Sequence, residues 1–138
     1  QAMDRIINFF PEERRPQLLM DLSLNLKAFV AQRLIGRKEG KGRVAAIEVM
    51  LNSPLMADLI FKGEVTEIKD LMKRSREMGM QTFDAALFDL YEEDAITYED
   101  ALRYADSVND LRLKIKLESK NASTRDLGSG MDHLEIVK

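Results

Sequence analysis

The sequence contains no cysteine, no tryptophan and only one histidine, His133. Without cysteine the chain can form no disulfide, no thiolate zinc site and no cysteine nucleophile. The single histidine has no second histidine beside it to form a metal site or a catalytic group. These absences argue against catalysis by this chain alone, and they fit a reducing, cytoplasmic compartment.

Long apolar runs and an excess of one charge are also missing. No run approaches the roughly 18 consecutive apolar residues of a membrane span, and no signal peptide is recognisable. The 21 lysine and arginine residues are balanced by 24 aspartate and glutamate residues, which argues against a general nucleic-acid binder. With 45% hydrophobic residues, the chain is expected to be a soluble globular segment with a buried core.

The first part of the chain predicts two helices. The opening Gln1-Ala2-Met3-Asp4 enters a helical pattern without a capping residue, so we expect the start to be a cut through a longer protein. Pro11 is expected to end the first helix near Phe10. A second helix is predicted from about Pro16 to Ala31, since its apolar residues recur at helical spacing. Those residues are Leu19, Leu22, Leu26, Phe29 and Val30.

A β-hairpin is predicted next. Residues 32–35 have an extended pattern, and the branched apolar residues of 44–51 predict a strand. Residues 36–42 form a charged, glycine-rich turn between them. A phosphate-binding P-loop would need four residues between its glycines, then Lys and Ser or Thr, and then a helix. Here Gly42 follows Lys41 and a strand comes next, so a plain hairpin turn is the favoured interpretation.

Helix-capping residues predict a helical second half. One helix is expected to end at Gly63, and the next to run from about Glu64 to Met78 and end at Gly79. Residues 119–138 are predicted to be a flexible tail, although the apolar run 134–137 could dock as a strand. The expected helix N-caps are Ser53, Thr82, Thr97 and Ser107.

Three groups of side chains are candidates for a binding or catalytic site. For each group, an ordinary structural role is the alternative. The acidic group straddles a helix end and the next helix start, so capping and solvation are favoured over a metal or acid–base pair. The basic group is expected to be solvated, or else to make an intersubunit or nucleotide contact. Methionines such as Met72, Met78 and Met80 could fill the core or form an adaptable groove for a partner. The acidic group is Glu92, Glu93, Asp94, Glu99 and Asp100, and the basic group is Arg33, Arg37, Lys38, Lys41 and Arg43.

Several segments, read in order, resemble the C-terminal part of the type IV pilus retraction ATPases of the PilU/PilT type, the twitching-motility motors of the secretion ATPase superfamily. The similarity covers about residues 1–117, and the ordered series is more specific than any one segment. The matching segments are Asp4-Arg5-Ile6-Ile7-Asn8-Phe9-Phe10-Pro11, Ala31-Gln32-Arg33-Leu34, Gly42-Arg43-Val44-Ala45-Ala46-Ile47-Glu48-Val49, Ser53-Pro54, Gly79-Met80-Gln81-Thr82-Phe83-Asp84 and Ile96-Thr97-Tyr98-Glu99-Asp100-Ala101.

The resemblance implies a hexameric, cytoplasmic motor, peripheral to the inner membrane, that uses ATP and magnesium to drive pilus disassembly. It implies that the P-loop, the acidic boxes and the histidine box precede Gln1, so this segment alone is not expected to bind ATP tightly or to hydrolyse it. The implied partners are further copies of the chain and the pilus machinery, with no nucleic acid and no transmembrane segment. An alternative is a non-enzymatic helical adaptor with a methionine-rich or basic binding face.

The resemblance also assigns candidate site residues. Residues 55–62 align with the helix that the retraction motors use for coupling, although Ala57 and Phe61 replace its two arginines and Lys62 its final acid. Phe61 is expected either to meet a partner or to be buried against the next helix. The coupling residues are Leu55, Met56, Asp58, Leu59 and Ile60. Residues near a subunit interface or nucleotide are Arg5, Gln32, Arg33, Arg43, Gly79, Gln81 and Thr82.

The predicted fold is α+β and mainly helical. Residues 1–52 would end an ATPase core domain, with a helix pair and a hairpin at the edge of an upstream RecA-like sheet. Residues 53–118 would form a C-terminal helical module, and residues 119–138 the flexible tail. A hairpin taken from such a sheet would expose a strand edge.

Overall fold

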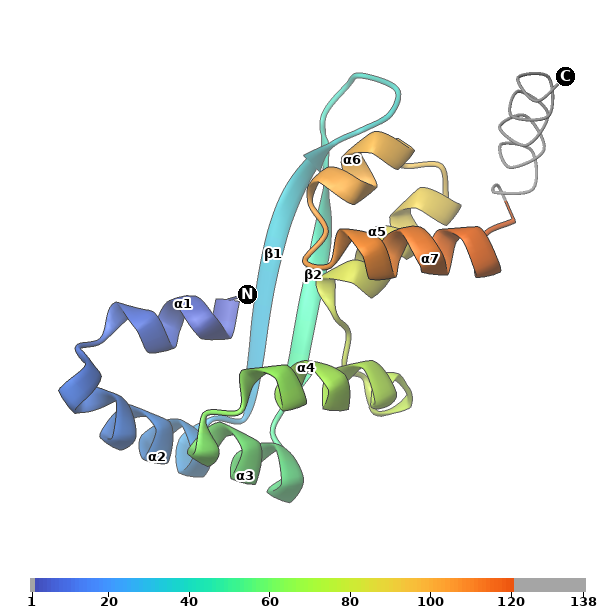
Figure 1. Cartoon of the computed structure of the whole chain (residues 1–138). Helices are drawn as coiled ribbons and strands as arrows, with labels where there is room; N and C mark the ends of the chain where they lie inside the picture. Colours follow the sequence, from blue (N-terminus) through green and yellow to red (C-terminus); the bar gives the residue numbers. More distant parts are fainter. Residues whose placement is uncertain (1, 121–138) are drawn as a thin grey trace, which may run out of the picture. The chain divides into compact units, whose positions relative to one another are not determined.

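The computed structural model describes residues 2–120, and the side chains from Arg5 onward. Helices dominate the described residues, which also form one two-stranded sheet (Figure 1). This confirms the predicted α+β, mainly helical class. The elements are α1 (Ala2–Phe9), η1 (Glu12–Arg14), α2 (Arg15–Asn25), β1 (Ala28–Gly36), β2 (Arg43–Leu51), α3 (Pro54–Lys62), α4 (Val65–Arg74), η2 (Arg76–Met78), α5 (Phe83–Glu92), α6 (Tyr98–Arg103) and α7 (Val108–Glu118).

The chain divides into two compact units. Unit 1 comprises Gln1–Arg33 and Ile47–Phe83, and unit 2 comprises Leu34–Ala46 and Asp84–Lys138. Each strand of the hairpin therefore contributes residues to both units. The predicted tail lies outside the described residues, apart from Ser119 and Lys120.

The second predicted helix is shorter than expected, because the chain enters β1 at Ala28. The backbone N–H of Asn52 donates to the carbonyl of Lys27 (3.0 Å), which pairs the outer ends of the two strands. Phe29 packs against the core of unit 1, whereas Val30 is exposed on the other face of the strand. The prediction of helix over 26–31 was therefore wrong, since strand pairing outweighed the helical spacing of Leu26, Phe29 and Val30.

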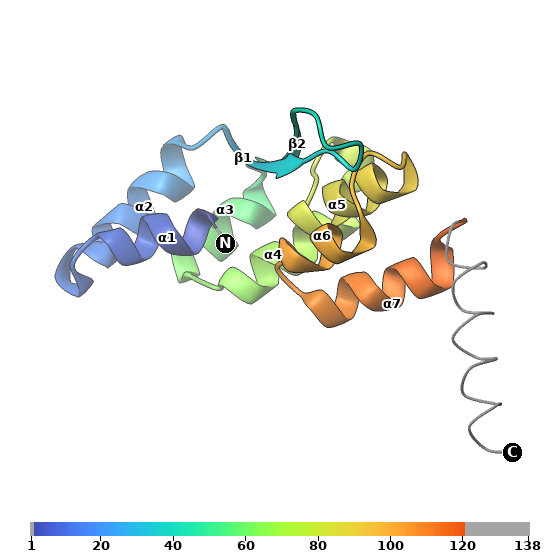
Figure 2. The ribbon, with the colours of Figure 1, turned by 90° about the horizontal axis from the view of Figure 1, so that it is seen from above.

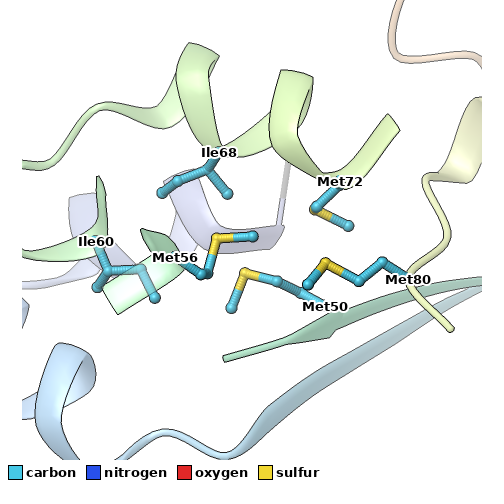
Figure 3. Packing of buried hydrophobic residues seen from close by; sticks show 6 residues of the cluster. All are labelled: Met50, Met56, Ile60, Ile68, Met72 and Met80. Atoms are coloured by element: carbon cyan, nitrogen blue, oxygen red, sulfur yellow. The ribbon is translucent and has the colours of Figure 1, made fainter. Parts of the chain in front are cut away.

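The core of unit 1 is rich in methionine (Figure 3). Unbranched thioether side chains adapt to irregular gaps between elements, which suits a core built from a strand and two short helices. Met72 and Met80 are therefore core residues, whereas Met78 is exposed. The buried cluster consists of Met50, Met56, Ile60, Ile68, Met72 and Met80.

Helix α3 has the boundaries that its end residues predict. The Ser53 hydroxyl accepts a hydrogen bond from the backbone N–H of Met56 (3.1 Å), and Gly63 ends the helix in the left-handed conformation, with φ 69°. Between these ends α3 packs against α2 and α4, which lie beside it in both views (Figures 1 and 2). The side-chain cap and the terminal glycine therefore fix a short helix that tertiary contacts hold in place.

Unit 2 is organised by the carboxylate of Asp84 in the first turn of α5. Its two oxygens accept hydrogen bonds from the backbone N–H groups of Asp106 (2.8 Å) and Ser107 (3.1 Å). Ser107 precedes α7, but its side chain makes no capping hydrogen bond, so the predicted capping box there was wrong. Thr97 does cap α6, because its hydroxyl accepts from the N–H of Asp100 (3.1 Å).

Candidate functional site

The predicted coupling helix, α3, has two different faces. Met56 and Ile60 are almost completely buried in the core, and Leu59 packs half-buried beside them. Leu55 is 55% exposed and Phe61 is 51% exposed. The inward residues thus hold the helix in unit 1, whereas the outward residues can meet another surface. We define the outer face of α3 as Leu55, Asp58, Phe61 and Lys62.

The outer face also carries an ion pair. The Lys62 ammonium lies 3.0 Å from the Asp58 carboxylate, one helical turn away, and both side chains are about half exposed. The pKa of Lys62 is raised above 10.5, mainly by the hydrogen bond to Asp58 and secondly by the negative charge of Asp58. Since the pair is exposed to solvent, it contributes little to the stability of the fold. Its two charges lie between the apolar side chains of Leu55 and Phe61.

Phe61 is not buried against the following helix, so that alternative was wrong. An aromatic ring that stays half exposed on a folded unit is typical of residues used at interfaces. Phe61 follows Leu55 by six residues, and the two lie near opposite ends of α3. Together with the Asp58–Lys62 pair they give the helix an outer face that is apolar at both ends and charged between them.

A second set of predicted site residues gathers around β2 within unit 1. The backbone groups of Gln81 and Val49 exchange two hydrogen bonds (2.8 and 2.9 Å), and the Gln81 amide donates to the carbonyl of Ile47 (2.7 Å). Thr82 follows and is buried. The Arg33 guanidinium lies over the Phe83 ring, 4.1 Å from its centre. The structure therefore places Arg33 against Phe83, the residue that follows Gln81 and Thr82 in the sequence.

The other interface candidates lie on separate elements. Arg5 is exposed on α1, and Gln32 is exposed on β1. Gly79, with φ 95°, ends η2 beside the side chain of Leu51. Arg43, exposed at the start of β2, belongs to unit 2. An interface role for all of these residues stays a prediction.

The glycine-rich turn is a hairpin tip held onto unit 2. The Lys38 ammonium lies 2.6 Å from the Asp94 carboxylate, and the Lys38 N–H donates to the carbonyl of Ala95 (2.9 Å). Asp94 itself has φ 63°, which aspartate tolerates better than most residues. The turn connects two strands instead of opening a helix, so its amides cannot cradle phosphate as a P-loop does.

Two side chains of the acidic group, Glu92 and Asp94, have structural partners. The Glu92 carboxylate binds the hydroxyl of Ser119 and accepts from the N–H of Lys120 (3.3 Å). Within residues 2–120, no three histidine, aspartate or glutamate side chains are arranged to hold a metal ion. The chain contains no P-loop, the glycine-rich loop that holds the phosphates in P-loop ATPases.

Asp84 is a key positioning residue that the sequence patterns did not single out. It is 7% exposed, and it joins the start of α5 to the loop before α7. An aspartate in a first helical turn is expected to interact with the amide groups of its own helix. The sequence indicates only this local interaction. It does not reveal the amides that Asp84 binds, because they lie more than 20 residues further along the chain.

Comparison with known proteins identifies similar chains, although no protein-family model matches. The chain is 66% identical over 137 residues to the type IV pilus ATPase PilU of Pseudomonas aeruginosa, covering 99% of this chain and 34% of that protein. It is 34% identical over 101 residues to the PilT retraction ATPase of the same organism, covering 73% of this chain and 29% of PilT. The chain thus spans about a third of the length of these relatives.

The fold gives the same result. A crystal structure of the pilus retraction motor PilT with bound ADP matches 80% of this chain and 30% of its own, with a TM-score of 0.66 and 29% identity. The ATPase DotB of Legionella pneumophila shares the fold, with a TM-score of 0.52 over 72% of this chain and 27% of its own. No helix within residues 2–120 is long and apolar enough to cross a bilayer. By sequence and by fold, the chain belongs to the family of type IV pilus ATPases that includes PilU and PilT.

Proposed function

We propose that this chain is the C-terminal segment of a hexameric motor ATPase that powers type IV pilus retraction and twitching motility. The observation that carries the proposal is the 66% identity to PilU over 137 residues. At this level the segment is expected to have the same fold and the same place in its motor. ATP and magnesium would then be bound by the remainder of the full-length protein.

Within that motor, the segment would couple nucleotide-driven movement to pilus disassembly through the outer face of α3. Met56 and Ile60 fix this helix to the core of unit 1, so a force on the outer face would be transmitted to the unit. The two family arginines are replaced by Ala57 and Phe61, so contacts of Leu55 and Phe61 would take the place of charge at this surface. The pilus machinery at the inner membrane is the proposed partner.

The further site assignments belong to the same proposal. Arg5, Gln32, Arg33, Arg43, Gly79, Gln81 and Thr82 would lie near a subunit interface or the nucleotide. The hairpin would complete the edge of an upstream RecA-like sheet, with residues 1–52 ending the core domain and residues 53–118 forming the C-terminal module. The apolar side chains of Val30 and Ile47, exposed on unit 1, support this assignment, since a layer packed on the face of such a sheet would cover them.

A chimera tests the proposal. The matched C-terminal third of P. aeruginosa PilU is replaced by this chain, and the chimera is expressed in a strain that lacks PilU. We expect hexamers that hydrolyse ATP and restore PilU-dependent motility, whereas PilU without its C-terminal third should restore nothing. A chimera that assembles and hydrolyses ATP but leaves motility at the level of the deletion strain would contradict the proposal.

A further inference from the structure

Helix α7 has two apolar faces, and the described structure covers one of them. Leu111 and Ile115, one helical turn apart, are buried in unit 2. Leu113 and Leu117, also one turn apart, are 56% and 73% exposed. The two pairs lie roughly 200° apart around the helix. A helix that is apolar on opposite faces is typically covered on both.

Cations flank the uncovered face. Arg112 and Lys116 are exposed and one turn apart, next to Leu113 and Leu117 in sequence. Lys114, by contrast, lies over the Phe88 ring of α5, 4.9 Å from its centre. A segment that fits the uncovered face should therefore carry apolar residues together with carboxylates.

The chain contains one such segment beyond the described residues. Residues 131–138 combine an apolar set with two acids and are separated from α7 by a polar stretch. The opposite charges match Arg112 and Lys116, and the apolar side chains match Leu113 and Leu117. The apolar residues of the segment are Met131, Leu134, Ile136 and Val137, and its acids are Asp132 and Glu135.

The position where the chain leaves α7 makes this contact possible within one molecule. Glu92 binds Ser119 and Lys120, so the chain departs from a fixed point next to the C-terminal end of α7. From there, residues 121–130 can reach at most about 35 Å. The distance back along α7 to Leu113 is only about 9 Å.

We propose that residues 131–138 of this chain dock on the uncovered face of α7, formed by Arg112, Leu113, Lys116 and Leu117. The apolar side chains of the segment cover the two leucines, and Asp132 and Glu135 pair with the two cations. The contact is intramolecular and does not depend on the motor function, so it can fail or hold independently of the chimera experiment.

Disulfide trapping in the whole cysteine-free chain tests this contact. Glu118→Cys and His133→Cys leave the proposed contact residues in place, and a disulfide requires Cα atoms within about 7 Å. The matched control pairs His133→Cys with Arg103→Cys on the exposed face of α6. Under a mild oxidant, we expect the Glu118 pair to close about tenfold faster than the control, because docking raises the effective concentration of the two thiols.

Charge reversal supplies a second readout. With the trapping pair present, Arg112→Glu and Lys116→Glu should slow closure, and adding Asp132→Lys and Glu135→Lys should restore it. Equal closure rates for the Glu118 and Arg103 pairs would overturn the proposal. It would also be overturned by disulfides that form only between chains, or by charge reversal that leaves the rate unchanged while circular dichroism shows an intact fold.

Discussion

The carboxylate of Asp84 accepts a hydrogen bond from the backbone N–H of Ser107, 3.1 Å away, so the first turn of α5 caps the start of α7. The second oxygen of Asp84 accepts from the N–H of Asp106. The Asp84 side chain is buried, so both of these bonds are shielded from water on the carboxylate side. These two bonds join the first turn of α5 to the residues just before α7 within unit 2.

Replacing Asp84 by alanine should therefore destabilise unit 2. The loss is expected to be about 1.5–3 kcal/mol, since hydrogen bonds to a charged acceptor are removed and two amides lose their acceptor. Urea unfolding followed by circular dichroism measures it. The control is Glu93→Ala, an exposed acid on the same unit, which should leave the midpoint nearly unchanged. Equal midpoints for the two variants would show that the Asp84 bonds contribute nothing.

Gly63→Ala should destabilise unit 1 by about 1–2 kcal/mol, because a Cβ is disfavoured in the left-handed region. Gly63 has φ 69°, and an added Cβ would lie 3.3 Å from the Cδ1 atom of Leu19. Gly36→Ala is the matched control, since Gly36 has no positive φ and its added Cβ would meet open space. Thermal unfolding of both variants tests the difference, and an equal loss at both positions would rule out the backbone explanation.

The ion pair on α3 has a defined pH dependence. Asp58 raises the pKa of Lys62 above 10.5, so the stabilising effect of the pair is complete below that pH and is lost as the pH rises through the raised pKa. Titration of the Lys62 side chain by NMR should show this raised pKa, and Asp58→Asn should lower it. At neutral pH the same substitution should hardly alter stability, since the pair is exposed. An unchanged pKa in Asp58→Asn would contradict the assignment.

Local sequence signals predicted some elements well. Ser53 and Gly63 act within α3 itself, so the cap and the terminal glycine were enough to set its ends. The branched residues of 44–51 likewise predicted β2. In both places the preference of the local sequence agrees with the final packing.

Other features depended on contacts between distant segments. Residues 28–31 pair as a strand because the other strand is available, and no local spacing reports that. Asp84 takes the amide of Ser107, which a local capping box would have used. The exposure of Phe61 could not be predicted either. Helical spacing shows on which face of a helix a residue lies, but not whether another element packs on that face.

The proposed role of the outer face of α3 is to couple the motor to its load. Polar substitution of Leu59 or Ile60 cannot test it cleanly, because Ile60 is a core residue and Leu59 packs against the core. Leu55→Ser with Phe61→Ser changes two half-exposed side chains and leaves the buried cluster in place. Met78→Ser is the matched control, since Met78 is 63% exposed on unit 1 outside α3.

The most direct measurement is retraction force and ATP hydrolysis in the same preparations of the full-length motor. We predict that the Leu55→Ser, Phe61→Ser double variant assembles and hydrolyses ATP like the unsubstituted motor but loses retraction, while Met78→Ser retains both activities. Normal retraction by the double variant, with assembly and hydrolysis intact, would contradict the claim that this face transmits force.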